Sequence, residues 1–190
     1  MRWLLVDSID VVVPGERIAG RAVVELPEAL VGDHFPGFPV TPGVILVEIA
    51  AQLCGKLIEA TVWEQQQVWV FPILSIVQDA KFRAFVPPSS TVELDAKLLE
   101  LRPESAMCRA TVKIGTRRHV TMKLVFVFDP EGASADGDRD FLEAYERNEL
   151  RRMGSPWTPG PGKADPPEGW QARWDQLKDR LPRQPPEPRL

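Results

Sequence analysis

Apolar and polar positions along the first two thirds of the chain predict strands on either side of one long helix. Residues 4–13 and 17–26 are rich in Val, Ile and Leu and flank Pro14-Gly15-Glu16, which predicts two strands joined by a tight turn. Residues 27–43 follow as a loop of prolines and glycines. Residues 44–66 contain no proline and are apolar nearly all round in their first half, which predicts a buried helix.

Four further strands are predicted after this helix. They cover residues 73–86, 91–101, 106–114 and 119–128, and each has β-branched content or strand-like alternation. Two strands, a long buried helix and a meander of strands indicate an α+β domain. In such a domain an antiparallel sheet must cover the helix.

The composition changes near residue 129, which indicates a domain boundary. Residues 129–190 contain neither Val nor Ile and hold ten of the nineteen prolines. We therefore predict one domain at residues 1–128 and a Pro-rich C-terminal extension with short helices, which docks on the domain rather than forming its own core. Trp170, Trp174, Leu177 and Leu181 follow helical spacing, which predicts a short helix near the end with one apolar side. The alternative is a flexible tail with incidental tryptophans.

Composition narrows the classes of function. The formal net charge is -4, so no overall basic field favours nucleic acid as a partner. Asp7 and Asp10 interrupt the first apolar run, and no stretch approaches the ~18 apolar residues of a membrane span, so we expect a cytoplasmic protein without one. Cys54 and Cys108 lack the spacing of disulfide or zinc motifs, so we expect reduced thiols and no metal.

The segment at residues 33–52, DHFPGFPVTPGVILVEIAAQ, carries the candidate chemistry. It places His34 in the loop and Glu48 inside the apolar helix. Either residue alone favours a structural interpretation, but together they resemble the signature of the FabZ-type 3-hydroxyacyl-acyl carrier protein dehydratases. The matching residues are His34-Phe35-Pro36-Gly37, Pro39, Pro42-Gly43-Val44, Glu48, Ala51 and Gln52. Weaker similarity extends the resemblance to roughly residues 3–128.

This resemblance implies a hot-dog fold, an antiparallel sheet wrapped around one long central helix. It implies a lyase that removes water from (3R)-hydroxyacyl thioesters to give trans-2-enoyl thioesters in fatty acid or related acyl or polyketide biosynthesis. The substrate is carried on the phosphopantetheine of acyl carrier protein, so no cofactor is expected. The family forms homodimers or oligomers of dimers, in which the histidine of one chain pairs with the glutamate of the other. We expect this for His34 and Glu48.

The proposed elimination explains why these residue types are needed. His34 titrates near neutrality and suits removal of the C2 proton. The apolar helix around Glu48 favours a protonated carboxyl that can donate to the departing hydroxyl. Negative charge on the thioester oxygen can be stabilised by the amide of Gly43 at the helix N-terminus. Gln52, one turn after Glu48, either orients it or bonds a backbone group.

Other residues leave alternatives open. The resemblance places Phe35 and Val44 at the substrate, whereas His119 is expected to be an exposed hairpin residue and Cys54 a small core residue. The exposed cations Lys81, Arg83, Arg117 and Arg118 either meet an acidic carrier protein or are simply solvated.

Two other functions remain open for the same fold. One is an enoyl-CoA hydratase-like enzyme acting on coenzyme A thioesters. The other is a non-catalytic acyl-binding or partner subunit, against which the presence of both His34 and Glu48 argues.

Overall fold

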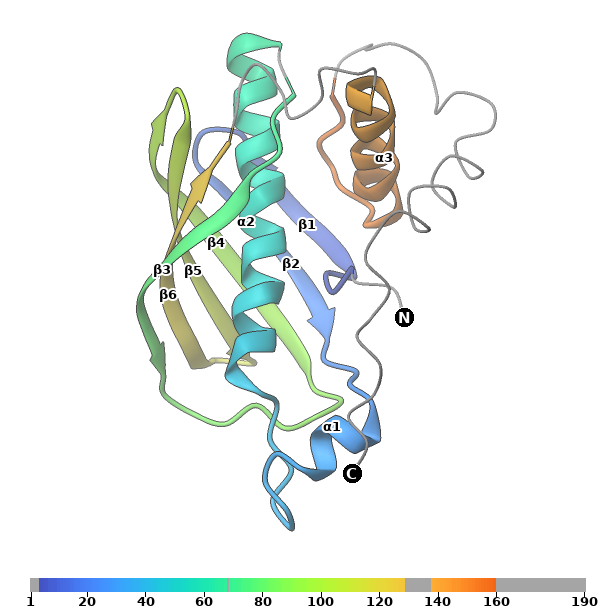
Figure 1. The fold of residues 1–190 in the computed structure, drawn as a ribbon, viewed down its shortest axis with the longest axis vertical. Helices are drawn as coiled ribbons and strands as arrows, with labels where there is room; N and C mark the ends of the chain where they lie inside the picture. The colour runs from blue at the N-terminus through green and yellow to red at the C-terminus, as the bar shows by residue number, and fades with distance from the viewer. Residues whose placement is uncertain (1–3, 68, 129–137, 160–190) are drawn as a thin grey trace, which may run out of the picture.

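The computed structural model describes residues 4–67, 69–128 and 138–159, with main chain only at 138–143. One helix, α2, crosses one face of a six-stranded antiparallel sheet whose order is β1-β2-β4-β5-β6-β3 (Figure 1). The strands are β1 Ser8–Val13, β2 Arg17–Val23, β3 Ile73–Phe82, β4 Thr91–Arg102, β5 Ser105–Ile114 and β6 Arg117–Val127. The helices are α1 Glu28–Gly32, α2 Gly43–Gln66 and α3 Asp138–Arg152. The predicted α+β class and central helix are confirmed.

Helix α2 is apolar nearly all round because it is buried nearly all round. It begins after Pro42, whose φ of -55° suits a helix start, and its end is capped where the amide of Gln67 donates to the carbonyl of Trp63 at 2.8 Å. Every side chain from Leu53 to Trp63 is buried. The helix therefore places Glu48, near its beginning, at a fixed position relative to the sheet.

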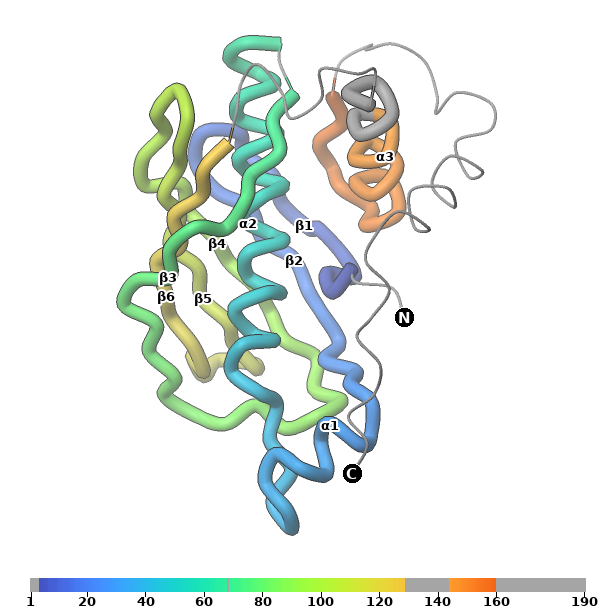
Figure 2. Tube along the Cα trace, in the orientation of Figure 1, coloured from blue at the N-terminus to red at the C-terminus, as the bar shows by residue number. Residues whose placement is uncertain are grey.

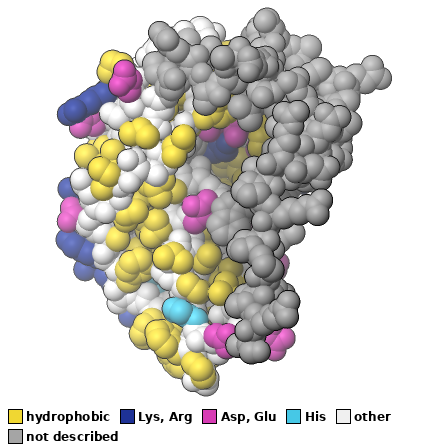
Figure 3. Space-filling view, viewed as in Figure 1, with side chains coloured by type: hydrophobic (Ala, Val, Ile, Leu, Met, Phe, Trp, Pro, Cys, Tyr) yellow, Lys and Arg dark blue, Asp and Glu magenta, His cyan; other side chains and the backbone are white. Residues whose placement is uncertain are grey.

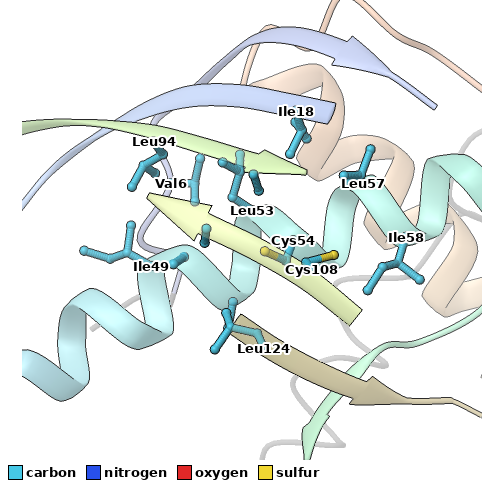
Figure 4. Packing of buried hydrophobic residues seen from close by; sticks show 14 of the residues in the cluster. Val6, Ile18, Ile49, Leu53, Cys54, Leu57, Ile58, Leu94, Cys108 and Leu124 are labelled. Carbon is cyan, nitrogen blue, oxygen red and sulfur yellow. The ribbon is translucent and has the colours of Figure 1, made fainter. Parts of the chain in front are cut away.

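The inner face of the sheet packs on α2 through alternate residues of each strand. Figure 4 shows Leu53, Cys54 and Leu57 of α2 facing Cys108 and Leu124 of the sheet. Cys54 is a fully buried core residue, as predicted. A hydrogen bond with Cys108 and burial raise the pKa of the Cys54 thiol well above its usual range.

Strand β3 lies at one edge of the sheet and is far more exposed than the other strands. Within the described part of the chain it pairs with β6 alone, and nine of its ten residues are exposed. Its exposed apolar residues include Ile73, Ile76 and Val77. A long, apolar strand edge of this kind is an assembly surface unless something covers it.

One expectation needs adjustment, and another concerns the extension. The predicted loop at residues 27–43 contains the short helix α1, which follows Pro27 and carries Glu28 in its first turn. The extension contributes α3, which lies beside α2 (Figure 1), with Leu150 and Met153 in the main hydrophobic core. The predicted apolar helix at residues 170–181 lies outside the described residues.

Candidate active site

His34 is held by the residue that closes its loop. Its ring Nδ1 lies 3.0 Å from the carbonyl oxygen of Val40, and the amide of Val40 donates to the carbonyl of His34 at 3.0 Å. Because a carbonyl oxygen can only accept, Nδ1 carries a proton in this contact. The neutral ring therefore presents Nε2 as a proton acceptor. The ring of Phe35 packs beside it at a centroid distance of 4.6 Å.

Glu48 is held by the side chain one helical turn later. The amide Nε2 of Gln52 donates to Oε1 of Glu48 at 3.0 Å, and Oε1 of Gln52 accepts from the backbone amide of Leu5 at 2.8 Å. Gln52 thus makes both kinds of contact that the sequence left open. The part played by Leu5 had no local sequence signal, since 47 residues separate it from Gln52.

Gly43 leaves room for a close approach by the ring of Phe82 in β3. A Cβ at this position would lie 2.9 Å from Cε1 of Phe82, nearer than a side chain can approach without displacement. The amide of Gly43 is in the first helical turn, where helix geometry supplies no backbone acceptor. A substrate oxygen held there would lie beside the ring of Phe82, a residue that the sequence pattern did not single out.

Exposed apolar side chains surround the histidine loop and the start of α2. Val44 is 73% exposed and Phe35 is 55% exposed, and Phe38 packs edge-on against Phe85 at a centroid distance of 5.6 Å. Figure 3 shows that hydrophobic side chains form a band along this face of the molecule. The candidate residues thus lie at one end of an apolar surface that continues along β3.

The expectation that His119 is an exposed hairpin residue is wrong. It is 7% exposed, and its Nδ1 donates to the carbonyl of Phe85 at 2.8 Å. The reason is a register shift between β5 and β6: Val112 pairs with Val120 and Lys113 with Arg118, so His119 lies at a bulge and its ring contacts the segment at Phe85. The amide of Arg83 donates to the carbonyl of His119 at 2.7 Å, which brings Arg83 beside the exposed Arg118.

A separate cavity of about 320 Å³ lies on the outer face of β1, β2 and β4. Its charged side chains pair with one another, as in Arg21 with Asp10 at 3.0 Å and Arg17 with Asp95 at 3.2 Å. None of the candidate residues lines it. The candidate site at His34 and Glu48 is therefore separate from this cavity.

The described residues also bear on metal sites and membrane-spanning helices. No group of three or more His, Cys, Asp or Glu side chains there is arranged to hold a metal ion. Among the described helices, none combines the length and hydropathy needed to cross a membrane.

Comparison with known structures supports the fold. The chain superposes on the dehydratase heterocomplex ApeI:P from Xenorhabdus doucetiae with a TM-score of 0.54 and 12% identity, covering 74% of this chain and 89% of that chain. It superposes on a thioesterase from Staphylococcus aureus with a TM-score of 0.51 and 12% identity, covering 65% and 93%. These likenesses show a shared hot-dog fold with different activities.

Comparison of sequences identifies the family. Residues 12–121 match the ApeI-like family, described as ApeI dehydratase. The 3-hydroxyacyl-[acyl-carrier-protein] dehydratase FabZ of Enterococcus faecalis is 32% identical over 125 residues, which cover 66% of this chain and 86% of that protein. FabZ of Clostridium acetobutylicum is 29% identical over 124 residues, covering 65% and 86%. The chain therefore belongs to the FabZ-type and ApeI-like family of hot-dog dehydratases.

Proposed function

We propose that this protein dehydrates (3R)-hydroxyacyl thioesters on acyl carrier protein to trans-2-enoyl thioesters. The observation that carries the proposal is the pair of separately fixed groups, an imidazole that presents Nε2 and a helix carboxyl held by an amide. The relatives named for this reaction in Enterococcus and Clostridium support it.

In the proposed reaction, Nε2 of His34 takes the C2 proton. The electrons of that C–H bond form the C2–C3 double bond as the C3 hydroxyl leaves, and Glu48 protonates the hydroxyl to give water. The amide of Gly43 stabilises the negative charge that develops on the thioester oxygen. The chain supplies the acceptor, the donor and the amide itself, so the proposal involves no cofactor.

The active form is proposed to be a homodimer joined through β3. Two copies of β3 placed side by side would extend the sheet and cover Ile76 and Val77, which are 48% and 44% exposed. The apolar surface near Val44 and Phe35 would then face the second copy, so that His34 of one chain could serve the same substrate as Glu48 of the other. Such a shared site accounts for apolar residues exposed beside polar catalytic groups.

The carrier is proposed to approach over the basic residues at the end of β3 and the start of β6. Lys81, Arg83, Arg117 and Arg118 are exposed there, and Lys81 is followed directly by Phe82, which covers Gly43. A basic surface beside the reaction site favours an acidic carrier protein through electrostatic steering.

Hydration of a crotonyl thioester, followed by loss of ultraviolet absorbance, tests the reaction in reverse. Matched crotonyl groups on acyl carrier protein and on coenzyme A separate the two carriers, and kcat/KM is expected to be higher for acyl carrier protein. Arg83→Glu should lower kcat/KM for the carrier-bound substrate, whereas Lys97→Glu, an equal charge change at an exposed position of β4, should not. No turnover of the crotonyl thioester on both acyl carrier protein and coenzyme A would contradict the proposal.

A further inference from the structure

The face of α2 that carries Glu48 continues into the contacts made by the C-terminal extension. Glu48, Gln52, Lys56, Glu59 and Trp63 are spaced by four, four, three and four residues, so they lie along one side of the helix. Gln52 contacts the N-terminal stretch before β1. The residues that follow it along this side contact α3.

Helix α3 is fixed to this side of α2 by buried charges. The ammonium group of Lys56 pairs with Glu59 at 3.2 Å and with Glu146 of α3. The guanidinium of Arg147 lies 4.7 Å from the ring centroid of Trp63, a cation–π contact. Loss of one partner from a buried charge pair is strongly destabilising, so these contacts fix how α3 sits on α2.

The chain that follows α3 holds the beginning of the molecule. It turns at Gly154, whose φ is +63°, and the amide of Ser155 donates to the carbonyl of Leu150 at 3.0 Å. The carbonyl of Met153 accepts a 2.9 Å hydrogen bond from the amide of Ile9 in β1. Figure 2 shows this part of the chain, in orange, beside α2 and β1. The N-terminal stretch is therefore held between α2 and the extension.

Four residues before Ile9, the amide of Leu5 fixes Gln52. Because Leu5 donates to Oε1 of Gln52, the side-chain amide must present its NH₂ group to Glu48. Loss of that donor would remove a contact that holds the Gln52 amide in this orientation. The position of residues 5–9 thus influences which group of Gln52 faces Glu48.

We propose that the turn at Leu150–Ser155 positions Glu48 for catalysis, acting through residues 5–9 and Gln52. The inference rests on the proposed dehydratase function and adds the extension to its machinery. The turn makes no contact with the substrate. Its loss is therefore expected to lower kcat and to leave KM unchanged.

The test uses Gly154→Ala in the full chain. A residue with a Cβ is strained at a φ of +63°, so the turn should shift. We expect kcat for crotonyl-thioester hydration to fall about two- to fivefold, with KM unchanged. Amide hydrogen exchange at Leu5 and Ile9 should become faster. The matched control is Gly115→Ala in the β5–β6 hairpin, where φ is +56° and a Cβ likewise meets nothing within 4 Å. It should lower the melting temperature without changing kcat or exchange at Leu5.

A double variant separates positioning from general destabilisation. Gln52→Met removes the link, so adding Gly154→Ala to it should cause no further loss of kcat. If Gly154→Ala does not fold, Trp157→Phe replaces it, since it removes the 2.9 Å hydrogen bond from Nε1 to Glu64 and part of the indole that packs on the core, while keeping an aromatic ring. Losses of kcat that multiply in the double variant would overturn the proposal.

Hydrogen exchange also distinguishes failure of this proposal from failure of the proposed function. An unaltered protein that turns over no thioester would contradict the dehydratase assignment alone. Unchanged exchange at Leu5 in both Gly154→Ala and Trp157→Phe would overturn the positioning role, whatever the activity.

Discussion

At the residue scale, two hydrogen bonds orient the two side chains of the proposed acid–base pair. The carbonyl of Val40 occupies Nδ1 of His34 and leaves Nε2 for the substrate, whereas Gln52 holds one oxygen of Glu48. Each contact orients one of the two candidate side chains for the proposed reaction.

His34→Ala and Glu48→Gln should each lower kcat by roughly 10²–10⁴-fold, because each removes one side of the proton transfer. Neither side chain is part of the buried core, so circular dichroism and the melting temperature should change little. The control is His119→Ala, which removes a buried histidine hydrogen-bonded to Phe85. It should lower the melting temperature while the folded protein keeps its kcat. Near-normal turnover by a folded His34→Ala or Glu48→Gln variant would contradict that residue's assignment.

Gly43→Ala should destabilise the protein by about 1–3 kcal/mol, because the added methyl group forces the ring of Phe82 to move. Phe82→Ala removes that ring, so the double variant should lose less stability than the two single changes predict together. Urea unfolding of the four proteins measures this coupling. If the losses of unfolding free energy in the two single variants add up in the double variant, the methyl group at position 43 does not clash with the ring of Phe82.

At the element scale, α2 and α3 are joined by charged side chains whose burial costs desolvation free energy. Burial raises the pKa of Glu59, although the charge and hydrogen bond of Lys56 lower it in part. The raised pKa shows that, for this carboxyl, desolvation outweighs the ion pair. The junction therefore gives α3 a defined position on α2 at a cost in stability.

The sign of this shift predicts how stability depends on pH. Because Glu59 binds a proton more tightly when folded, its contribution is fully present below its unfolded pKa. That contribution is lost as the pH rises through the raised folded pKa. Glu59→Gln should therefore flatten the decline in unfolding free energy across this range, as measured by urea titration at several pH values. Parallel pH profiles for the two proteins would contradict the prediction.

At the scale of the whole molecule, the two edges of the sheet differ. The β1 edge donates a hydrogen bond to the extension, from the amide of Ile9 to the carbonyl of Met153, whereas β3 remains exposed along its length within the described chain. Covering one edge and exposing the other favours assembly through β3 alone, and hence a closed dimer.

Mixing His34→Ala with Glu48→Gln tests whether the site is shared in such a dimer. Each mixed dimer would contain one intact site, so random exchange of subunits should restore about a quarter of the unaltered activity. Native mass spectrometry checks that exchange has occurred. Exchange without recovery would place both groups of each site in one chain.

A feature could be predicted when the residues that cause it are neighbours in the sequence, and could not when they are far apart. The helix over residues 44–66, the strands and the pair His34 and Glu48 follow from local periodicity, proline placement and a contiguous motif. The burial of His119 could not be predicted in this way, because a register shift between β5 and β6 places it at a bulge.

The sequence by itself determined which elements form, which helix is buried and which two side chains carry the proposed chemistry. Only the tertiary structure decided the hydrogen bond from Leu5 to Gln52, the approach of Phe82 to Gly43 and the docking of α3 on Lys56. Each of these joins residues about 40 to 90 positions apart, whereas side-chain periodicity reports only on neighbours within a turn or a strand. Such contacts form only when the chain folds and the helix packs on the sheet, and this packing gives the candidate side chains their partners.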